Sequence, residues 1–254
     1  MQAELTIIIP AKNECQTLPR LLTSLSRQQY PLLPHTRVYV ADAASTDATA
    51  AIAQLTATQL GLQLAVIPGG LPAQGRNAGA RLARTPYILF LDADVELRDP
   101  RLLFRAVNHM RMHELHCVTT DIHCPHGTAA DRFLFRANNA VQRASRWGAP
   151  FATGMFMLFD RAVFQQLGGF DESALYAEDY LLTKQVDRNR FAVVRGGVVT
   201  SNRRFQKMGR ARIARMFLTT AINSRNLQYF QIDQGYWSQP ARPVASSNGD
   251  RAAS

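Results

Sequence analysis

The chain has 254 residues, of which 46% are hydrophobic and 19% charged, and its formal net charge is +10. This length allows one large α/β domain or two small ones, and the composition is that of an ordinary globular protein. No stretch reaches the ~18 to 20 strongly apolar residues of a membrane span, and three cysteines suggest no disulfide framework, so we expect a protein of the reducing cytoplasm, attached at most to a membrane surface.

The first half of the chain alternates strand-like and helix-like segments. The N-terminal apolar run stops at Pro10 and lacks a preceding basic segment, which argues against a signal peptide. Pro19 suits the first turn of a helix that begins near Thr17, and Ser45 or Thr46 suits a helix N-cap. We predict strands over residues 5–9, 37–42, 62–67 and 86–92, and helices from near residue 17 and over 45–60 and 76–84.

Strands that are apolar throughout and alternate with helices predict a mostly parallel sheet covered by helices on both faces. Functional sites in such sheets lie beyond the carboxyl ends of the strands. The four predicted strands end in the segments PAKNE, DAASTD, GGLPAQGRNAG and DAD. The first, second and fourth of these segments carry acidic residues, and the third carries Arg76 and Asn77. We therefore expect the functional site at this edge.

The second half is less regular. Helices over about 100–112 and 128–146 flank a predicted strand at 116–123, and a further strand is expected at 153–160. A short helix with a Gly-Gly stop follows, and another helix begins near Glu178. We place one domain over residues 1–232, divided into a nucleotide-binding half (1–95) and an acceptor half (96–232) with a basic C-terminal helix. Residues 238–254 have the composition of a disordered tail.

Asp92 and Asp94 follow a buried strand two residues apart. Because strand side chains alternate, both carboxylates could point to the same side and repel each other, so something positive must offset them. One interpretation is a turn or helix N-cap pair. The other is a Mg²⁺ or Mn²⁺ site, in which one or two carboxylates and the phosphates of a substrate share the cation, with Asp92 holding either a ribose or the water shell of that cation.

Glu178 and Asp179 are expected at a helix N-terminus, where an acid pair complements the helix dipole. The functional interpretation makes one of them a general base that takes a proton from an acceptor hydroxyl. Asp42 either caps the helix that follows it or binds a nucleobase or ribose. Arg76 and Asn77 either start a helix or bind a diphosphate beside the glycine-rich loop.

The net charge is concentrated near the C-terminus. Residues 188–232 hold ten basic residues and no acid, and removing these ten from the 29 basic residues leaves 19, which balance the 19 acidic residues. Such a field favours nucleotide phosphates, lipid headgroups or nucleic acid. Within it, Arg203 and Arg204 are suited to meeting a leaving diphosphate. Ile213, Phe217 and Ala221 recur every four residues, as expected of a helix that packs on its own domain or lies on a membrane surface.

Five segments, taken in order, resemble the family 2 nucleotide-sugar glycosyltransferases: TIIIPAKNE, VADAASTDAT, GRNAGARLARTPYILFLDADV, TGMFMLFDRAVFQQLGGFDES and AEDYLL. The resemblance covers about residues 5–205. It implies a single GT-A type, Rossmann-like domain and an inverting transfer of a sugar from a UDP- or GDP-linked donor to a saccharide or lipid-linked acceptor.

The resemblance also implies roles for individual residues. The segment from Pro10 and Ala11 to Glu14, together with Asp42, would hold the nucleoside, and Arg76 and Asn77 would lie near the base or the diphosphate. Asp92 would contact the ribose or the metal, and Asp94 would ligate Mn²⁺ or Mg²⁺. Gly154 would lie at the acceptor side, and Asp179 would be the general base, with Glu178 as its neighbour. The cation would then offset the repulsion between Asp92 and Asp94.

Two departures from the family pattern narrow the interpretation. The usual second-strand acid pair followed by glycine is DAAS here, so only Asp42 is available for nucleotide choice. The Gln-x-x-Arg-Trp signature of processive synthases is absent, which favours transfer of a single sugar.

Other classes fit the sequence less well. A nucleotidyltransferase would want a glycine-rich loop with Lys or Arg after the first strand, and a glycosidase would need neither nucleotide pocket nor cation. A non-catalytic binder of anionic lipid or nucleic acid would use residues 188–232, yet the aromatics there form no known nucleic-acid motif, and we expect no nucleic-acid partner. An accessory role at an anionic membrane surface, at the inner face of the membrane, fits the same segment.

Overall fold

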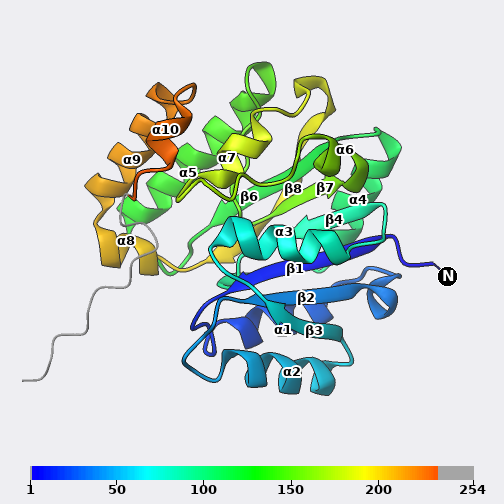
Figure 1. Ribbon diagram of the computed structural model, residues 1–254. Coiled ribbons are helices and arrows are strands. Elements are labelled where there is room, and N and C mark those ends of the chain that lie inside the picture. The colour runs from blue at the N-terminus through cyan, green and yellow to red at the C-terminus, as the bar shows by residue number, and fades with distance from the viewer. Residues whose placement is uncertain (1, 234–254) are drawn as a thin grey trace, which may run out of the picture.

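The computed structural model describes residues 2–233. Eight strands in this range form one curled sheet in the order β3-β2-β1-β4-β7-β6-β8-β5 (Figure 1). The strands are β1 (Leu5–Ala11), β2 (Arg37–Asp42), β3 (Gln63–Pro68), β4 (Tyr87–Phe90), β5 (Val95–Glu96), β6 (Cys117–His123), β7 (Met157–Asp160) and β8 (Phe191–Thr200). The α-helices are α1 (Leu18–Ser26), α2 (Thr49–Leu60), α3 (Pro72–Leu82), α4 (Leu102–Met112), α5 (Ala129–Ala144), α6 (Arg161–Gln166), α7 (Glu178–Thr183), α8 (Arg203–Met208), α9 (Arg210–Ile222) and α10 (Leu227–Phe230).

The sheet is mostly parallel, as predicted. β3, β2, β1 and β4 pair in parallel, and so do β6 and β8. β7 is antiparallel to both of its neighbours, β4 and β6, and β5 is antiparallel to β8. The carboxyl ends of β1, β2 and β3 are in register, with Ala11 opposite Asp42 and Asp42 opposite Pro68. The turns after these strands therefore meet at one edge, where the sequence predicts the functional site.

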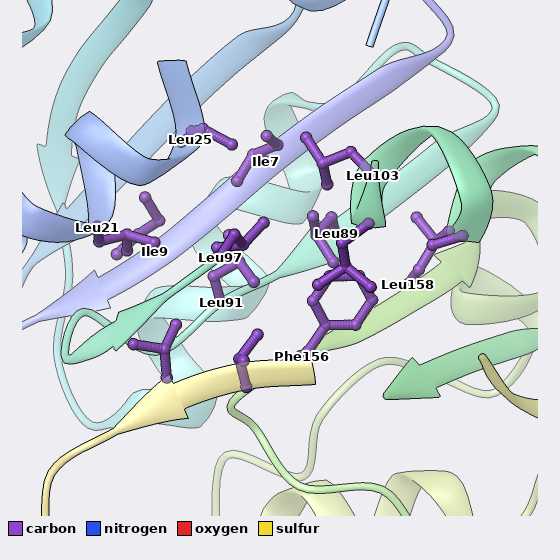
Figure 2. Close-up of a cluster of buried hydrophobic side chains, with 14 of the residues drawn as sticks. Ile7, Ile9, Leu21, Leu25, Leu89, Leu91, Leu97, Leu103, Phe156 and Leu158 are labelled. Atoms are coloured by element: carbon purple, nitrogen blue, oxygen red, sulfur yellow. The ribbon is translucent and has the colours of Figure 1, made fainter. Parts of the chain in front are cut away.

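Helices cover both faces of the sheet because its central strands are apolar on both sides. Ile7 and Ile9 of β1 are fully buried in one core cluster, which contains side chains of α1 and α4 (Figure 2). Ile8, between them, is buried in the other cluster, with side chains of α3 and α6. This arrangement explains why β1 is an uninterrupted apolar run rather than an alternating one.

The predicted elements of the first half are present with shifted ends. α2 begins at Thr49 rather than near residue 45, because Ser45 instead donates a hydrogen bond from its hydroxyl to Asp42 (2.5 Å). α3 begins at Pro72, four residues before the predicted start, since proline at a helix N-terminus loses no hydrogen bond. β4 ends at Phe90, so Asp92 and Asp94 lie in the following turn and not on a strand.

Two of the described strands, β5 and β8, were not predicted from the sequence. β8 runs parallel to β6 and antiparallel to the short edge strand β5. Its Gly196 has a φ of +118°, and the pairing with β6 shifts register between Thr120 and Ile122, so the strand bends at this point. The predicted strand at 153–160 is confined to Met157–Asp160. The segment before it, including Gly154, is a loop that reaches the sheet edge.

The basic C-terminal helix is two helices, α8 and α9, separated by Gly209 with a φ of +81°. In Figure 1 these helices lie with α10 at one end of the molecule, beside α5 and α7. The helix α9 packs on its own domain through Ile213, as predicted, and through Met216. The other two residues of the predicted stripe, Phe217 and Ala221, are exposed. No helix within residues 2–233 is both long enough and apolar enough to cross a membrane. The tail predicted at 238–254 lies outside the described residues.

Candidate functional site

The turn after β1 and the turn after β2 are tied to each other by side chains. The Asp42 carboxylate accepts hydrogen bonds from the backbone N–H of Ser45 (3.1 Å) and from its hydroxyl (2.5 Å). The Ser45 hydroxyl oxygen accepts in turn from the N–H of Asn13 (2.9 Å), and the Asn13 side chain accepts from the N–H of Thr46 (2.8 Å). Asp42 is thus half-buried and held in the loop by Ser45. Its contact with a nucleoside stays a prediction.

A close approach of α3 to the sheet holds Pro10 and Ala11 at the same edge. Gly75 of α3 lies over the end of β1 and β2, where a β-carbon would sit 3.2 Å from the Ala41 side chain and 3.5 Å from that of Pro10. Ala11 is buried, and Pro10 is half-buried. The glycine therefore lets α3 deliver the next residue, Arg76, directly to this edge.

Arg76 is buried, with 1% of its surface exposed, and joins two carboxylates from distant parts of the chain. Its Nη2 lies 2.7 Å from Asp92 Oδ1, and its Nη1 lies 2.5 Å from Glu178 Oε1. The guanidinium also lies over the Phe170 ring, 5.3 Å from the centroid. Because unpaired buried charges are costly, Arg76 and these two carboxylates hold one another in place. Asn77, by contrast, binds the backbone of Phe170 through both ends of its amide (2.8 and 3.0 Å).

Gly154 is required by the position of Arg76. A β-carbon at residue 154 would lie 2.2 Å from Arg76 Nη2 and 3.2 Å from Asp92 Oδ1. The first distance is far below any normal contact, so only glycine fits while Arg76 stays in place. The loop before β7 thereby comes close enough for the Gly154 N–H to bind the acid on α7.

Asp179 is that acid. Its Oδ2 accepts a hydrogen bond from the Gly154 N–H (2.8 Å), and its Oδ1 accepts one from the Tyr180 N–H (2.8 Å). Burial, together with the adjacent charge of Glu178, raises the pKa of Asp179 to about 7, against the opposing effect of Arg76. A carboxylate with its pKa near neutrality is suited to proton transfer. Glu178 is itself buried and is held by Arg76.

Asp94 has a different cationic partner from Asp92. Arg203, the first residue of α8, places Nη2 3.2 Å from Asp94 Oδ2 and 2.5 Å from Glu14 Oε1, while its Nη1 lies 3.0 Å from Glu14 Oε2. Burial and the nearby charge of Asp92 raise the pKa of Asp94, and Arg204 and Arg203 oppose this. The repulsion predicted between the two aspartates is thus offset here by arginines, Arg76 for Asp92 and Arg203 for Asp94.

The carboxylates of Asp92 and Asp94 provide only part of a binding site for a divalent cation. Among residues 2–233, no three His, Cys, Asp or Glu side chains come together as a site that could hold a metal ion by itself. Arg76 binds Asp92 Oδ1 at 2.7 Å, whereas Arg203 lies farther from Asp94 Oδ2, at 3.2 Å, so Asp94 is the better placed of the two carboxylates. Mg²⁺ and Mn²⁺ commonly bind through one or two carboxylates and the phosphates of a substrate. The residues therefore fit a cation that binds together with a diphosphate.

A pocket of about 110 Å³ opens beside Asp179. Arg76, Asp92, Gly154 and Arg204 line it together with residues of α7, and residues of α9 form a further wall. The edge of the sheet that carries Asp94 and the pocket that carries Asp179 thus share Arg76 and Asp92. An anionic group at the edge and a hydroxyl in the pocket would be neighbours.

One network near the site was not predicted. Asp131, fully buried at the start of α5, accepts hydrogen bonds from Arg210 Nε (2.6 Å) and Asn202 Nδ2 (2.8 Å) and from the Thr128 N–H (2.9 Å). It anchors both ends of α8 to the domain and so positions Arg203 and Arg204. The Thr128-x-x-Asp131 spacing, typical of a capping box, was the available signal for the helix start, but nothing in the sequence indicated Arg210 as the partner.

Comparison with known proteins identifies relatives of this chain. The model of the family "Glycosyl transferase family 2" matches residues 6–168. Over 91 residues, 35% of this chain, the sequence is 31% identical to poly(ribitol-phosphate) β-N-acetylglucosaminyltransferase TarS from Staphylococcus aureus, and that match spans 16% of the length of TarS.

Solved structures of similar fold are glycosyltransferases of the GT-A type. The mannosyltransferase PcManGT from Pyrobaculum calidifontis, in complex with GDP-Man and Mn²⁺, superposes with a TM-score of 0.67 at 23% identity over 88% of this chain and 65% of its own. TarS from S. aureus with UDP-GlcNAc gives 0.61 at 21% identity over 78% and 58%. Glucosyl-3-phosphoglycerate synthase from Mycobacterium tuberculosis, with Mn²⁺, UDP-Glc and phosphoglyceric acid, gives 0.61 at 18% identity over 87% and 79%.

Proposed function

Because this chain belongs to glycosyl transferase family 2, we propose that it transfers one sugar from a UDP- or GDP-linked donor to a hydroxyl of an acceptor, with inversion at the anomeric carbon. Structural relatives were solved with GDP-Man, UDP-GlcNAc and UDP-Glc, which supports a nucleotide-sugar donor. The chain spans only part of several relatives, 16% of the curated TarS sequence and 65% of PcManGT.

One observation carries this proposal. Asp179, an acid whose pKa is raised to about 7, opens into a pocket that shares Arg76 and Asp92 with the carboxyl edge of the parallel strands. A general base beside an edge suited to anions would be idle in a protein that only binds nucleotides. The arrangement is what an enzyme needs to bring a hydroxyl to an activated sugar.

The two halves of the chain would have separate tasks. Residues 1–95 would bind the nucleoside through Pro10, Ala11, Glu14 and Asp42, with Asn77 beside them. Residues 96–232 would supply the acceptor side through Gly154 and Asp179. Arg76 belongs to the first half and Glu178 to the second, so their ion pair of 2.5 Å would fix the positions of the two halves relative to each other.

The proposed reaction is a single displacement. Asp179 takes the proton of the acceptor hydroxyl while that oxygen forms a bond to the anomeric carbon, and the bond from this carbon to the diphosphate breaks, its electron pair leaving with the diphosphate. The Gly154 N–H orients the Asp179 carboxylate. Arg203 and Arg204 meet the negative charge that develops on the diphosphate. A Mg²⁺ or Mn²⁺ ion held by Asp94, with Asp92 beside it, would add positive charge at the phosphates when bound.

Arginine and apolar side chains together favour a second, accessory role at an anionic membrane surface. Leu218 and Ile222 of α9 are 63% and 71% exposed, and Arg215 precedes Leu218 by three residues, on the same side of the helix. Helices of this kind lie at lipid interfaces. Co-sedimentation with vesicles tests this role, and we expect pelleting with anionic lipid and loss of pelleting in Leu218→Gln/Ile222→Gln. Equal pelleting with zwitterionic vesicles would refute it.

The experiment that tests the main proposal is calorimetric titration of UDP and GDP into the wild type and Asp94→Ala, each with Mn²⁺ and with chelator. We expect one nucleotide to bind in a cation-dependent way and the variant to lose most of this binding. If neither nucleotide binds with the cation present, the transferase proposal fails. Cation-independent binding that Asp94→Ala leaves unchanged would refute the role of Asp94 alone.

A further inference from the structure

The pocket beside Asp179 has two chemically different sides. Its floor carries the charged groups Arg76, Asp92 and Glu178, whereas the wall formed by α9 consists of Ile213, Met216 and Phe217 with Thr220. The Thr220 hydroxyl is already used, because it donates to the Met216 carbonyl oxygen (2.8 Å). The wall therefore offers carbon and sulfur atoms to a ligand and little hydrogen bonding.

The apolar wall is a fixed part of the domain. Met216 packs in a small core cluster with Leu181 of α7 and Phe230 of α10. Two polar contacts hold the same elements, a hydrogen bond from Lys184 Nζ to the Ser224 carbonyl oxygen (2.6 Å) and one from the Leu175 N–H to the Phe230 carbonyl oxygen (2.8 Å). Together with the Arg210–Asp131 ion pair, they fix α9 beside Asp179.

The wall also continues out of the pocket. Phe217 lines the pocket and is at the same time 51% exposed, so its ring spans from the interior to the surface of the molecule. A ligand larger than the 110 Å³ of the pocket could follow the ring outward. Aromatic side chains further strengthen the apolar character of the cavity, since Phe151 and Tyr180 line it in edge-to-face contact with each other (6.1 Å between centroids).

Resting on the transferase function proposed above, we propose that the acceptor is an amphipathic alcohol. Its reacting hydroxyl would lie at Asp179, and an apolar body, an alkyl chain or an aromatic ring system, would lie against Ile213, Met216 and Phe217. An acceptor with hydroxyl groups all around would place several of them against this wall without partners, which is costly. An apolar body instead gains by leaving water there.

The test is a series of alkyl β-D-glucosides from methyl to octyl, used below their micelle concentrations, so that only the apolar part varies. Binding to the wild type with Mn²⁺ and the nucleotide found by titration should tighten with each added methylene. Full burial of one methylene corresponds to about a fourfold gain in affinity. Phe217→Ala should flatten this dependence. Phe133→Ala, which removes an equally large exposed ring from α5 outside the pocket, should preserve it.

The outcomes separate this inference from the function on which it rests. If nucleotide binds but affinity does not change with chain length, the acceptor inference fails and the transferase proposal stands. Equal flattening in Phe217→Ala and Phe133→Ala would also overturn the inference, because the effect would not come from the pocket wall. If no nucleoside diphosphate binds, the transferase proposal fails and takes the acceptor inference with it.

Discussion

The backbone N–H of Gly154 donates a hydrogen bond to Asp179 across 2.8 Å, although the two residues lie on different elements, 25 positions apart. With Arg76 in its ion pairs, the contact requires glycine at residue 154, since a β-carbon there would lie 2.2 Å from the Arg76 guanidinium. The orientation of the proposed base thus depends on the close approach of the loop at residue 154, which glycine permits beside Arg76. Both the acid and the arginine can be tested by substitution.

Asp179→Asn should lower transfer by about 10²- to 10⁴-fold, because the amide cannot accept the proton of the acceptor. In the wild type, the rate should fall as the pH drops through about 7, where Asp179 becomes protonated, and this limb should vanish from the residual activity of the variant. Initial rates between about pH 5 and 9 check both statements. Nucleotide affinity serves as the control and should stay within about twofold. An unchanged pH profile would refute Asp179 as the base.

Arg76→Met should destabilise the fold by about 3–5 kcal/mol, because it leaves the buried carboxylate of Glu178 and the partly exposed carboxylate of Asp92 without their cation. Urea unfolding near neutral pH measures this loss. Arg81→Met is a matched control on the same helix, since Arg81 also pairs with an acid, Glu172 at 3.5 Å, but both side chains are exposed. The control should cost less than about 1 kcal/mol. Similar costs for the two variants would contradict the central position assigned to Arg76.

Arg203→Ala should weaken binding of the nucleoside diphosphate about tenfold or more. The substitution removes a positive charge that would lie near the phosphates. It also leaves the carboxylates of Glu14 and Asp94, which Arg203 neutralises in the wild type, to repel the phosphates. The loss should be larger for the nucleoside diphosphate than for the free nucleoside, which has no phosphates to contact Arg203. Arg225→Ala, an exposed arginine of the same basic segment, controls for the loss of one positive charge. Calorimetry with UDP, GDP, uridine and guanosine decides the matter, and equal losses in both variants would refute a specific role for Arg203.

Asp131 should stabilise the protein in a pH-dependent way. Hydrogen bonding from Arg210 above all holds the pKa of Asp131 well below its ordinary value. A carboxylate with a lowered folded-state pKa contributes stability that is present above about pH 4, its unfolded pKa, and is lost as the pH falls towards the folded value. The difference in Tm between the wild type and Asp131→Asn should therefore be large near neutral pH and shrink below about pH 4. A constant difference would rule out ionisation as its source.

The fold of residues 1–95 could be predicted well because its signals are local. β1 and β2 are short apolar runs, and a parallel sheet forces their ends to one edge, so Glu14 and Asp42 could be placed together from the order of strands and turns alone. The partners of these residues could not be predicted in the same way. Arg76 is 16 residues from Asp92 and 102 from Glu178, and no local rule connects such positions.

The failures in the second half also have physical causes. β8 contains two glycines and an arginine, which weaken the strand pattern, yet Val193, Val194, Val198 and Val199 were a β-branched signal that went unused. On α9, periodicity alone selected Phe217 and Ala221 as the buried face. The face that packs is set by the positions of α7 and α10, which bury Met216 instead.

The two ion pairs of Arg76 also make proton uptake and ligand binding interdependent. The guanidinium is shared between Asp92, on the proposed donor side, and Glu178. Next to burial, the charges of Glu178 and Arg76 are the main influences on the pKa of Asp179. We therefore expect a ligand that changes the charge at Asp92, and with it the ion pairs of Arg76, to alter the protonation equilibrium of Asp179. By thermodynamic reciprocity, protonation of Asp179 must alter the affinity for that ligand by the same factor. The pH at which the donor is bound would then help to set when the acceptor is activated.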